Sequence, residues 1–267
     1  MGSPGQHRRH RNGLQPDGGR AHRAGPRPHL QASLQCAHRH RRSARAPARE
    51  AVLRARGAIL AGGGATRFGG KPKGLEMVGG ERILDRLVRV MTAALDEPPL
   101  LVANLPEAPD WRPDLRVVPD IRRGLGSLGG IYTAVVEAPA PVVCVAWDMP
   151  FVPEGLLRRL AGGLLEHDAC LPQSGGRRGV EPLCAAYGPA CREAIARSLD
   201  QGDLRAIAFH ERIRVGILPL SEVGRFGEPE LLFFNVNTAD DLALTDGLWQ
   251  RLESSPSSGG KTPGRPR

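Results

Sequence analysis

The feature that most constrains the fold is an alternation of short, continuously apolar runs with segments of helical periodicity. Four of these runs, at residues 58–61, 99–103, 115–118 and 141–146, are interrupted by a charged residue only at Arg116, and each is followed within two residues by glycine or a polar side chain. Strands that are apolar throughout are typical of parallel sheets covered on both faces. The alternation therefore predicts an α/β fold with a mostly parallel sheet and helices on both faces.

The rest of the chain continues the same pattern. Apolar residues recur at helical spacing over residues 83–95, and a helix follows the glycine-rich stretch at residues 124–130. The helix at the glycine-rich stretch is predicted over 128–136. Further helices are predicted at 153–165, 189–199 and 204–210, and further strands at 169–171, 182–187 and 215–218. The run LLFFNVNT (residues 231–238) is interpreted as an extended segment, after which Thr238 caps a last helix.

Charge divides the chain into an arm, a body and a tail. Residues 1–50 hold 11 Arg, one Asp and one Glu, so they carry the whole net charge of +9. Residues 1–52 have too little apolar surface to offset the entropy of ordering, which predicts a disordered basic arm. A mis-called start, with Val52 as the true one, is a second interpretation. Residues 254–267, rich in Ser, Gly and Pro, are predicted to be a disordered tail.

The body, residues 53–253, is predicted to be a single domain. The stretch 51–253 carries 23 basic and 26 acidic residues, which argues against nucleic-acid binding by the body. Five cysteines form no CxxC pair and have apolar neighbours, which indicates a reducing, cytoplasmic environment. No apolar run approaches the roughly 18 residues of a transmembrane helix, so no membrane association is expected.

The segment after the first strand, LAGGGATRFGGKPKGL (residues 60–75), has the chemistry of a phosphate-binding loop. Its glycines allow sharp turns and close approach of the backbone to a ligand. Successive N–H groups can cradle phosphate oxygens, and Arg67 and Lys73 can neutralise them. The spacing matches neither a Walker A loop nor a GxGxxG dinucleotide loop.

Carboxylate and amide side chains follow other strands. Asp148 ends the most hydrophobic strand, where a carboxylate is costly unless it is paired or holds a metal. Mg²⁺ takes one or two carboxylates together with substrate phosphates. Asn235 and Asn237 share one face of an extended segment and can join a metal shell or bind phosphate. The alternatives are a solvated Asp148 that caps the next helix, and Asx-turn or N-cap roles for the asparagines.

The motif LAGG-xxx-R-x-GG-xx-KGL resembles the signature loop of nucleotidylyltransferases with a Rossmann-like fold, the nucleotide-diphospho-sugar transferase type. Within them the chain is most similar to the molybdenum cofactor guanylyltransferases, over residues 56–244. Members of that family transfer GMP from GTP to the phosphate of molybdenum-molybdopterin, forming the guanine dinucleotide cofactor and releasing pyrophosphate. The resemblance implies the same reaction here, with Mg²⁺ as cofactor.

The resemblance also assigns the base and leaves alternatives open. Relatives that use pyrimidine nucleotides usually have alanine where Gly62 stands, so Gly62 favours guanine. Lys71-Pro72 stands where the family often has an acidic residue before the loop lysine, and Ser127 replaces the usual proline of a GPLAG-like stretch. A cytidylyltransferase for molybdopterin and a sugar-1-phosphate nucleotidylyltransferase therefore remain alternatives. A nucleotide-binding cofactor carrier is the non-enzyme alternative.

The site residues implied by the resemblance fall into four groups. The catalytic residues are Arg67, Lys73 and Asp148. The nucleotide-binding residues are Leu60, Ala61, Gly62, Gly63, Lys73, Asn104, Asp120 and Asp148. The metal ligands are Asp148 and Asn237, and the acceptor-binding residues are Asn235, Asn237 and Arg177.

The implied partners are GTP and molybdenum-molybdopterin. Transient contacts with other cofactor-biosynthesis proteins or with molybdoenzyme chaperones are also expected from the resemblance. The sequence contains no GxSxG motif, no Cys–His constellation and no zinc-ligand spacing. A reaction that depends on positioning and charge neutralisation needs no protein nucleophile, which agrees with phosphoryl-type transfer.

Overall fold

A computed structural model describes residues 54–62 and 72–254 of the 267-residue chain. These residues all belong to one compact unit, Glu50–Arg267. The predicted arm (1–52) and tail (254–267, apart from Ser254) lie outside the described residues, and so do Gly63 and Arg67 of the glycine-rich loop.

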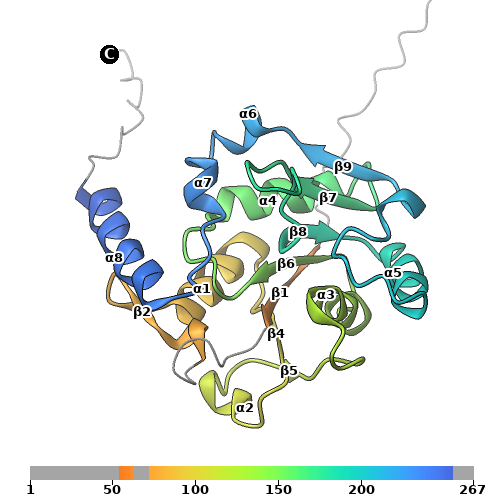
Figure 1. Cartoon of the computed structure of the whole chain (residues 1–267), viewed down its shortest axis with the longest axis horizontal. Helices are drawn as coiled ribbons and strands as arrows, with labels where there is room; N and C mark the ends of the chain where they lie inside the picture. Colours follow the sequence, from red (N-terminus) through yellow and green to blue (C-terminus); the bar gives the residue numbers. More distant parts are fainter. Residues whose placement is uncertain (1–53, 63–71, 255–267) are drawn as a thin grey trace, which may run out of the picture. The chain divides into compact units, whose positions relative to one another are not determined.

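Seven strands form the main sheet, in the order β5-β4-β1-β6-β8-β7-β9 (Figure 1). Every neighbouring pair is parallel except the two pairs that involve β8, which runs antiparallel to both β6 and β7. The strands are β1 (Arg56–Ala61), β4 (Leu100–Ala103), β5 (Val117–Val118), β6 (Val142–Ala146), β7 (Ala169–Pro172), β8 (Cys184–Tyr187) and β9 (Val215–Leu218).

Helices cover both faces of this sheet and bury two separate apolar cores (Figure 1). Helices α1 (Ile83–Leu95) and α4 (Glu154–Gly163) pack on one face, and α3 (Gly126–Glu137) and α5 (Cys191–Asp200) on the other. Along β1, Ile59 enters the first core and Leu60 the second, because side chains alternate across a strand. The predicted fold class is therefore confirmed.

Two local predictions are wrong. Residues 204–210 do not form a helix but a series of turns that ends in the 3₁₀ helix η3 (His210–Arg212), with short-range bonds such as Ala208 N–H to the Arg205 carbonyl. The apolar run at 231–238 begins as the end of helix α7 (Pro229–Leu232), because a proline in the first turn favours helix initiation. Only the part after Leu232 leaves the helix, and it carries both asparagines of the predicted site.

The strand predicted at 115–118 is shorter than expected. The Leu115 N–H donates to the Arg112 carbonyl in a turn, so β5 begins only at Val117. The remaining elements are short or lie at the end of the chain. They are η2 (Lys73–Leu75), the hairpin of β2 (Met77–Val78) and β3 (Glu81–Arg82), α2 (Ala108–Trp111), α6 (Leu220–Val223) and α8 (Ala239–Ser254).

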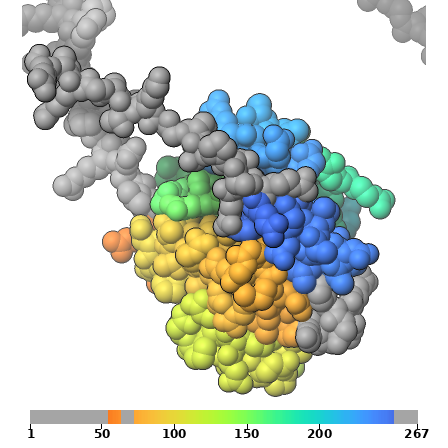
Figure 2. All heavy atoms as spheres, turned by 90° about the vertical axis from the view of Figure 1, so that its left-hand side faces the viewer, coloured from red at the N-terminus to blue at the C-terminus, as the bar shows by residue number. Residues whose placement is uncertain are grey.

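Helix α8 packs against β2, although the two are far apart in sequence. Figure 2 shows the blue surface of α8 directly against the orange surface of the segment that contains β2 and α1. Cys144, Cys170, Cys184 and Cys191 are free and buried. Within the described ranges, no helix is long and apolar enough to cross a membrane.

Adjacent glycines near the end of α4 provide a test of the packing between helix and sheet. A Cβ on Gly163 would lie 2.3 Å from Cys170 Sγ and 2.7 Å from Cys170 Cβ in β7, whereas one on Gly162 would meet no described atom within 4 Å. We expect Gly163→Ala to lower the free energy of unfolding by about 1–3 kcal/mol through overpacking. Gly162→Ala should raise it by up to about 1 kcal/mol through helix propensity.

Urea unfolding of both variants measures the difference. Equal stability of the two variants would show that α4 does not press on β7 as described.

Candidate active site

A pocket of about 410 Å³ lies where the parallel strands β1, β4, β5 and β6 end. Residues at or just after the carboxyl ends of these strands form its wall, together with the first turns of α3. The lining residues are Leu60, Gly62, Val102, Asn104, Asp120, Gly124, Gly126, Ser127, Gly130, Ala146, Trp147, Asp148, Leu183 and Asn235. Carboxyl ends of parallel strands are where α/β folds bind ligands.

Lys73 joins two segments of the site at the edge of this pocket. Its Nζ donates to Asn237 Oδ1 at 2.7 Å and lies 3.8 Å from Asp148 Oδ2. The Lys73 side chain is 13% exposed and that of Asp148 is 17% exposed, so both charges are largely withdrawn from water. Residues from the glycine-rich loop, the end of β6 and the segment before α8 therefore meet at one point.

The segment that carries the two asparagines is anchored to Asp148 by its backbone. The buried Val236 donates its N–H to the Asp148 carbonyl at 2.9 Å, between Asn235 and Asn237. Asp241 in the first turn of α8 accepts from the N–H group of Asn237 at 2.9 Å, so the helix start also holds this segment. Asn235 consequently lines the pocket while Asn237 reaches Lys73.

Asp148 is held in an electrostatically costly position. Burial raises the pKa of its carboxyl group above the ordinary value, and the Lys73 ammonium only partly opposes this effect. A carboxylate that is poorly solvated and incompletely paired gains most from an added cation.

Asn104 and Asp120 form a second polar pair on the opposite wall of the pocket. The Asn104 amide donates to Asp120 Oδ2 at 2.6 Å, and the Asp120 N–H donates to Asn104 Oδ1 at 2.9 Å. The other carboxylate oxygen, Asp120 Oδ1, is buried and has no hydrogen-bond partner among the described residues. A buried acceptor of this kind is available to a ligand donor or a water molecule.

Two glycines of the glycine-rich segment 60–75 have different structural roles. A Cβ on Gly74 would lie 2.4 Å from the Trp147 ring, so Gly74 is required by packing. A Cβ on Gly62 would meet no atom of the described residues within 4 Å, so packing against them does not require glycine there. Because Gly62 lines the pocket, an added methyl group would enter the space available to a ligand.

Arg177 lies outside this pocket. It lines a neighbouring cavity of about 500 Å³ that is formed by the connection from β7 to β8. Glu181 lines that cavity and accepts from the N–H of Leu183, which lines the main pocket, so the two cavities adjoin. Burial raises the pKa of Glu181, and the negative charge of Asp148 adds to this, while Arg178 opposes it. The structure thus brings together the other described candidates but sets Arg177 apart.

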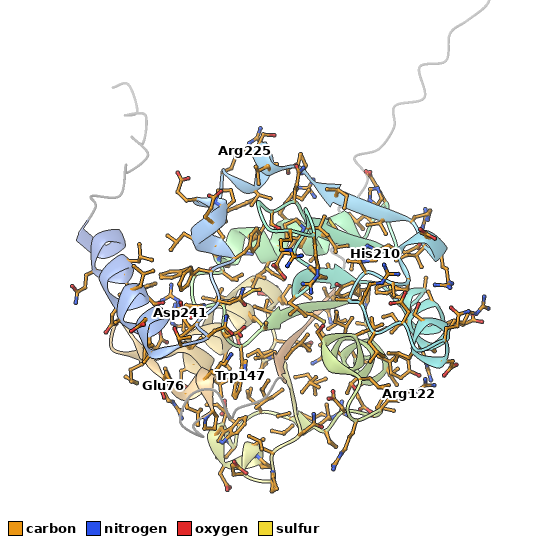
Figure 3. The ribbon with its side chains drawn as sticks, in the orientation of Figure 1. Glu76, Arg122, Trp147, His210, Arg225 and Asp241 are labelled. Carbon is orange, nitrogen blue, oxygen red and sulfur yellow. The ribbon has the colours of Figure 1, made fainter. Side chains whose placement is uncertain are left out.

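Trp147, Val102 and Leu183 line the pocket but were not among the predicted site residues. Trp147 also packs in the core, where it stacks on Trp111 with ring centroids 5.3 Å apart. Its place in the sequence, directly before Asp148, is the signal from which its position in the pocket could have been predicted. Figure 3 shows Trp147 well away from His210 and Arg225, which lie over other parts of the sheet.

The donor set of the pocket suits a hard cation that is shared with a ligand. In the part of the chain that the structure describes, no cluster of three His, Cys, Asp or Glu side chains could hold a metal ion alone. Asp148 supplies one carboxylate, and Asn237 supplies one neutral amide oxygen at the edge of the pocket. Mg²⁺ typically takes such a partial set and completes its shell with phosphate oxygens and water.

The raised pKa of Asp148 gives a pH test. Burial disfavours the ionised form of Asp148 in the folded protein. The free energy of unfolding therefore falls as the pH rises from the pKa of Asp148 in the unfolded chain, near 3.8, through its higher pKa in the folded protein. We therefore expect Asp148→Asn to have a higher Tm than the wild type at pH 7 without divalent cations. The difference should shrink as the pH falls towards 4.

Thermal melts across this pH range provide the measurement. Asp110→Asn, at an exposed position on α2, is the control and should show no such gain. A variant of Asp148 that is less stable than the wild type at pH 7 would mean that the contact with Lys73 outweighs the cost of burial.

Comparisons with known proteins agree on one family. The model of the MobA-like NTP transferase domain matches residues 57–214. A molybdenum cofactor guanylyltransferase from Desulfosudis oleivorans is 33% identical over 190 residues, which cover 70% of this chain and 91% of that protein. A probable molybdenum cofactor guanylyltransferase from Pelotomaculum thermopropionicum is 35% identical over 192 residues, covering 72% and 91%.

A solved structure supports the same relationship. The crystal structure of molybdopterin-guanine dinucleotide biosynthesis protein A from Archaeoglobus fulgidus superposes with a TM-score of 0.62 at 25% identity. The match covers 73% of this chain and 99% of that chain.

Proposed function

The chain belongs to the family of MobA-like NTP transferase domains and is a nucleotidyltransferase, and on this premise we propose that it transfers GMP from GTP to the phosphate of molybdenum-molybdopterin. The products are the guanine dinucleotide form of the cofactor and pyrophosphate. One observation carries the proposal, namely the make-up of the pocket at the strand ends. Gly62 lines it at a point where an added Cβ would meet no described atom within 4 Å, and Lys73 lies at its edge beside Asp148 and Asn237. Relatives named guanylyltransferases supply the choice of base.

The nucleoside would occupy the part of the pocket between β1 and β5. Gly62 leaves room for a purine, and the pair of Asn104 and Asp120 offers amide and carboxylate groups on the facing wall. The backbone of Leu60 and Ala61 leads into this wall from β1. A pocket of about 410 Å³ is within the usual range of roughly 300–1,000 Å³ for small-molecule sites.

The triphosphate would extend towards Lys73. Its ammonium group neutralises phosphate oxygens, and Arg67 and the backbone of Gly63 are proposed to act beside it. An oxygen of the acceptor phosphate attacks the α-phosphorus, the bond from that phosphorus to the bridging oxygen breaks, and pyrophosphate leaves with the bonding electron pair. When bound at Asp148 and Asn237, Mg²⁺ supplies further neutralisation of the phosphate charge.

The acceptor would approach from the side of the two asparagines. Asn235 lines the pocket, and the cavity that contains Arg177 adjoins it through Glu181 and Leu183. An arginine in that cavity suits an anionic acceptor. Contacts with other cofactor-biosynthesis proteins or with molybdoenzyme chaperones would serve delivery and release of the cofactor, and they remain part of the proposal.

The carrier alternative is less well supported than catalysis. A carrier needs the nucleotide pocket but not a largely buried ion pair at its edge. The burial of Lys73 and Asp148 is costly unless these charges neutralise a ligand.

Pyrophosphate release tests the function directly. We expect Mg²⁺-dependent release from GTP in the presence of molybdenum-loaded molybdopterin, and only background release without an acceptor. Assays with CTP and UTP, and with glucose 1-phosphate in place of molybdopterin, separate the two alternative transferases. Binding of GTP without release under any of these conditions would instead favour the carrier.

The choice of base is tested at Gly62. A methyl group there would occupy space that a purine needs more than a pyrimidine does, and size discrimination of this kind is worth about 1–3 kcal/mol, or roughly 10–200-fold. We expect Gly62→Ala to lower the GTP-to-CTP ratio of kcat/KM by tens-fold. Lys73→Ala should instead lower kcat/KM for both nucleotides, by about 100-fold or more, because it contacts phosphate rather than base.

An unchanged ratio in Gly62→Ala would mean that the base is selected elsewhere. The loop at residues 124–130, which contributes Gly124, Gly126 and Ser127 to the pocket, would then be the next position to vary.

A further inference from the structure

Three segments that carry site residues also meet at a second point, away from the pocket. Lys73 leads into the β2–β3 hairpin, Asp148 leads into Pro150 and Phe151, and Asn237 leads into α8. The third segment carries Trp249, near the far end of α8, and the other two contact its ring, which does not line the pocket. Trp249 is thus the common contact of the chain segments that support the phosphate end of the site.

Arg86 of α1 connects these segments on one face of the indole. Its guanidinium lies 3.6 Å from the centroid of the Trp249 ring, a close cation–π contact. The same group donates through Nε to the Pro150 carbonyl at 2.6 Å and lies 3.9 Å from Glu81 Oε2 in β3. Arg86 therefore touches the hairpin, the segment after Asp148 and α8 at once.

Other contacts hold the indole from further sides. Phe151 stacks on Trp249 with ring centroids 6.0 Å apart. Gly79, in the β2–β3 turn with a φ of +58°, lies so close that an added Cβ would be 2.0 Å from Trp249 Cδ1. The Gly79 N–H also donates to Asp246 Oδ1 of α8 at 2.8 Å. The β2–β3 turn therefore packs against the Trp249 ring so closely that residue 79 has no room for a side chain.

We propose that Trp249 is a positioning residue that holds α8 against the β2–β3 hairpin and thereby keeps Asn237 on Lys73 and beside Asp148. The proposal rests on the proposed nucleotidyl transfer, since it assigns these three side chains to phosphate and cation binding.

The rigidity of α8 carries the effect of Trp249 to the site. Asn237 and Thr238 donate their N–H groups to Asp241 Oδ2, so both are tied to the first turn of the helix. An α-helix is a stiff element, so a change in docking at Trp249 shifts its first turn and with it Asn237, which the Val236 N–H to Asp148 bond holds only through the neighbouring residue. Gly62, Asn104 and Asp120 lie on strand ends that do not depend on α8.

This separation predicts a specific kinetic signature. Loss of Trp249 should displace the bound cation and the reacting phosphates. The residues proposed to contact the nucleoside, Gly62, Asn104 and Asp120, should stay in place. A misplacement of about 1 Å at a reacting group can cost roughly 100-fold in rate. We expect Trp249→Ala to lower kcat by about tenfold or more and to weaken Mn²⁺ binding in the presence of GTP about tenfold. The KM for GTP should change less than about threefold.

The experiment compares three variants of the full chain by Mn²⁺ electron paramagnetic resonance titration with GTP, by steady-state kinetics and by thermal melts. Trp249→Phe keeps a flat ring over Arg86 and should retain most of the Mn²⁺ affinity. Leu244→Ala, at a 48% exposed position on the same helix, is the matched control and should equal the wild type. Should Trp249→Ala not fold, Trp249→Leu preserves apolar volume while removing the ring face.

The outcomes are distinct. Weakened Mn²⁺ binding and lower kcat with a nearly unchanged KM for GTP, rescued in Trp249→Phe, would support the positioning role. Wild-type Mn²⁺ affinity and kcat in a folded Trp249→Ala or Trp249→Leu variant would overturn it, even if Tm falls. Absence of Mn²⁺–GTP binding in the wild type would contradict the proposed function itself, and with it this inference.

Discussion

The pairing of β1 with a parallel neighbour on each side, β4 and β6, is the constraint on which the rest of the structure depends. Parallel neighbours cannot be joined by tight turns, so the chain must cross over through helices, and these cover the two faces. The same pairing brings the carboxyl ends of the strands to one edge. Residues separated by long stretches of sequence, such as Gly62, Asn104 and Asp148, then share one pocket.

Charge burial is the second determinant, and it acts locally at that edge. Asp148 and Lys73 are both largely shielded from water, yet they lie 3.8 Å apart and Lys73 donates to Asn237 instead. Burial raises the pKa of the Asp148 carboxyl group, and Lys73 opposes this effect only in part. In the proposed function, a bound cation would relieve part of the cost of burying Asp148, and phosphate oxygens would relieve part of the cost of burying Lys73.

Much of this arrangement could be predicted from the sequence, because apolar periodicity directly reports burial. Helix α1 begins and ends at the predicted residues, and the polar residues after the strands do surround the pocket. What failed depends on local or tertiary contacts that periodicity does not encode. The turns at 204–210 are held by short-range bonds, and the position of Arg177 follows from the β7–β8 connection. The docking of Trp249 requires a glycine turn that is remote in sequence.

The reversed strand β8 has a consequence for how such enzymes can diversify. Because β8 runs antiparallel to both neighbours, β7 ends and β8 begins at the same edge as the pocket, and their connection needs no crossover. The connection, residues 173–183, contains one isolated bridge, of Gln173 with Val180, and a turn in which the Gly179 N–H donates to the Gly176 carbonyl. Insertions or deletions there would remodel the cavity that contains Arg177 without shifting any strand register. The fold thus separates a pocket fixed by the ends of parallel strands from a neighbouring cavity whose wall can change in length.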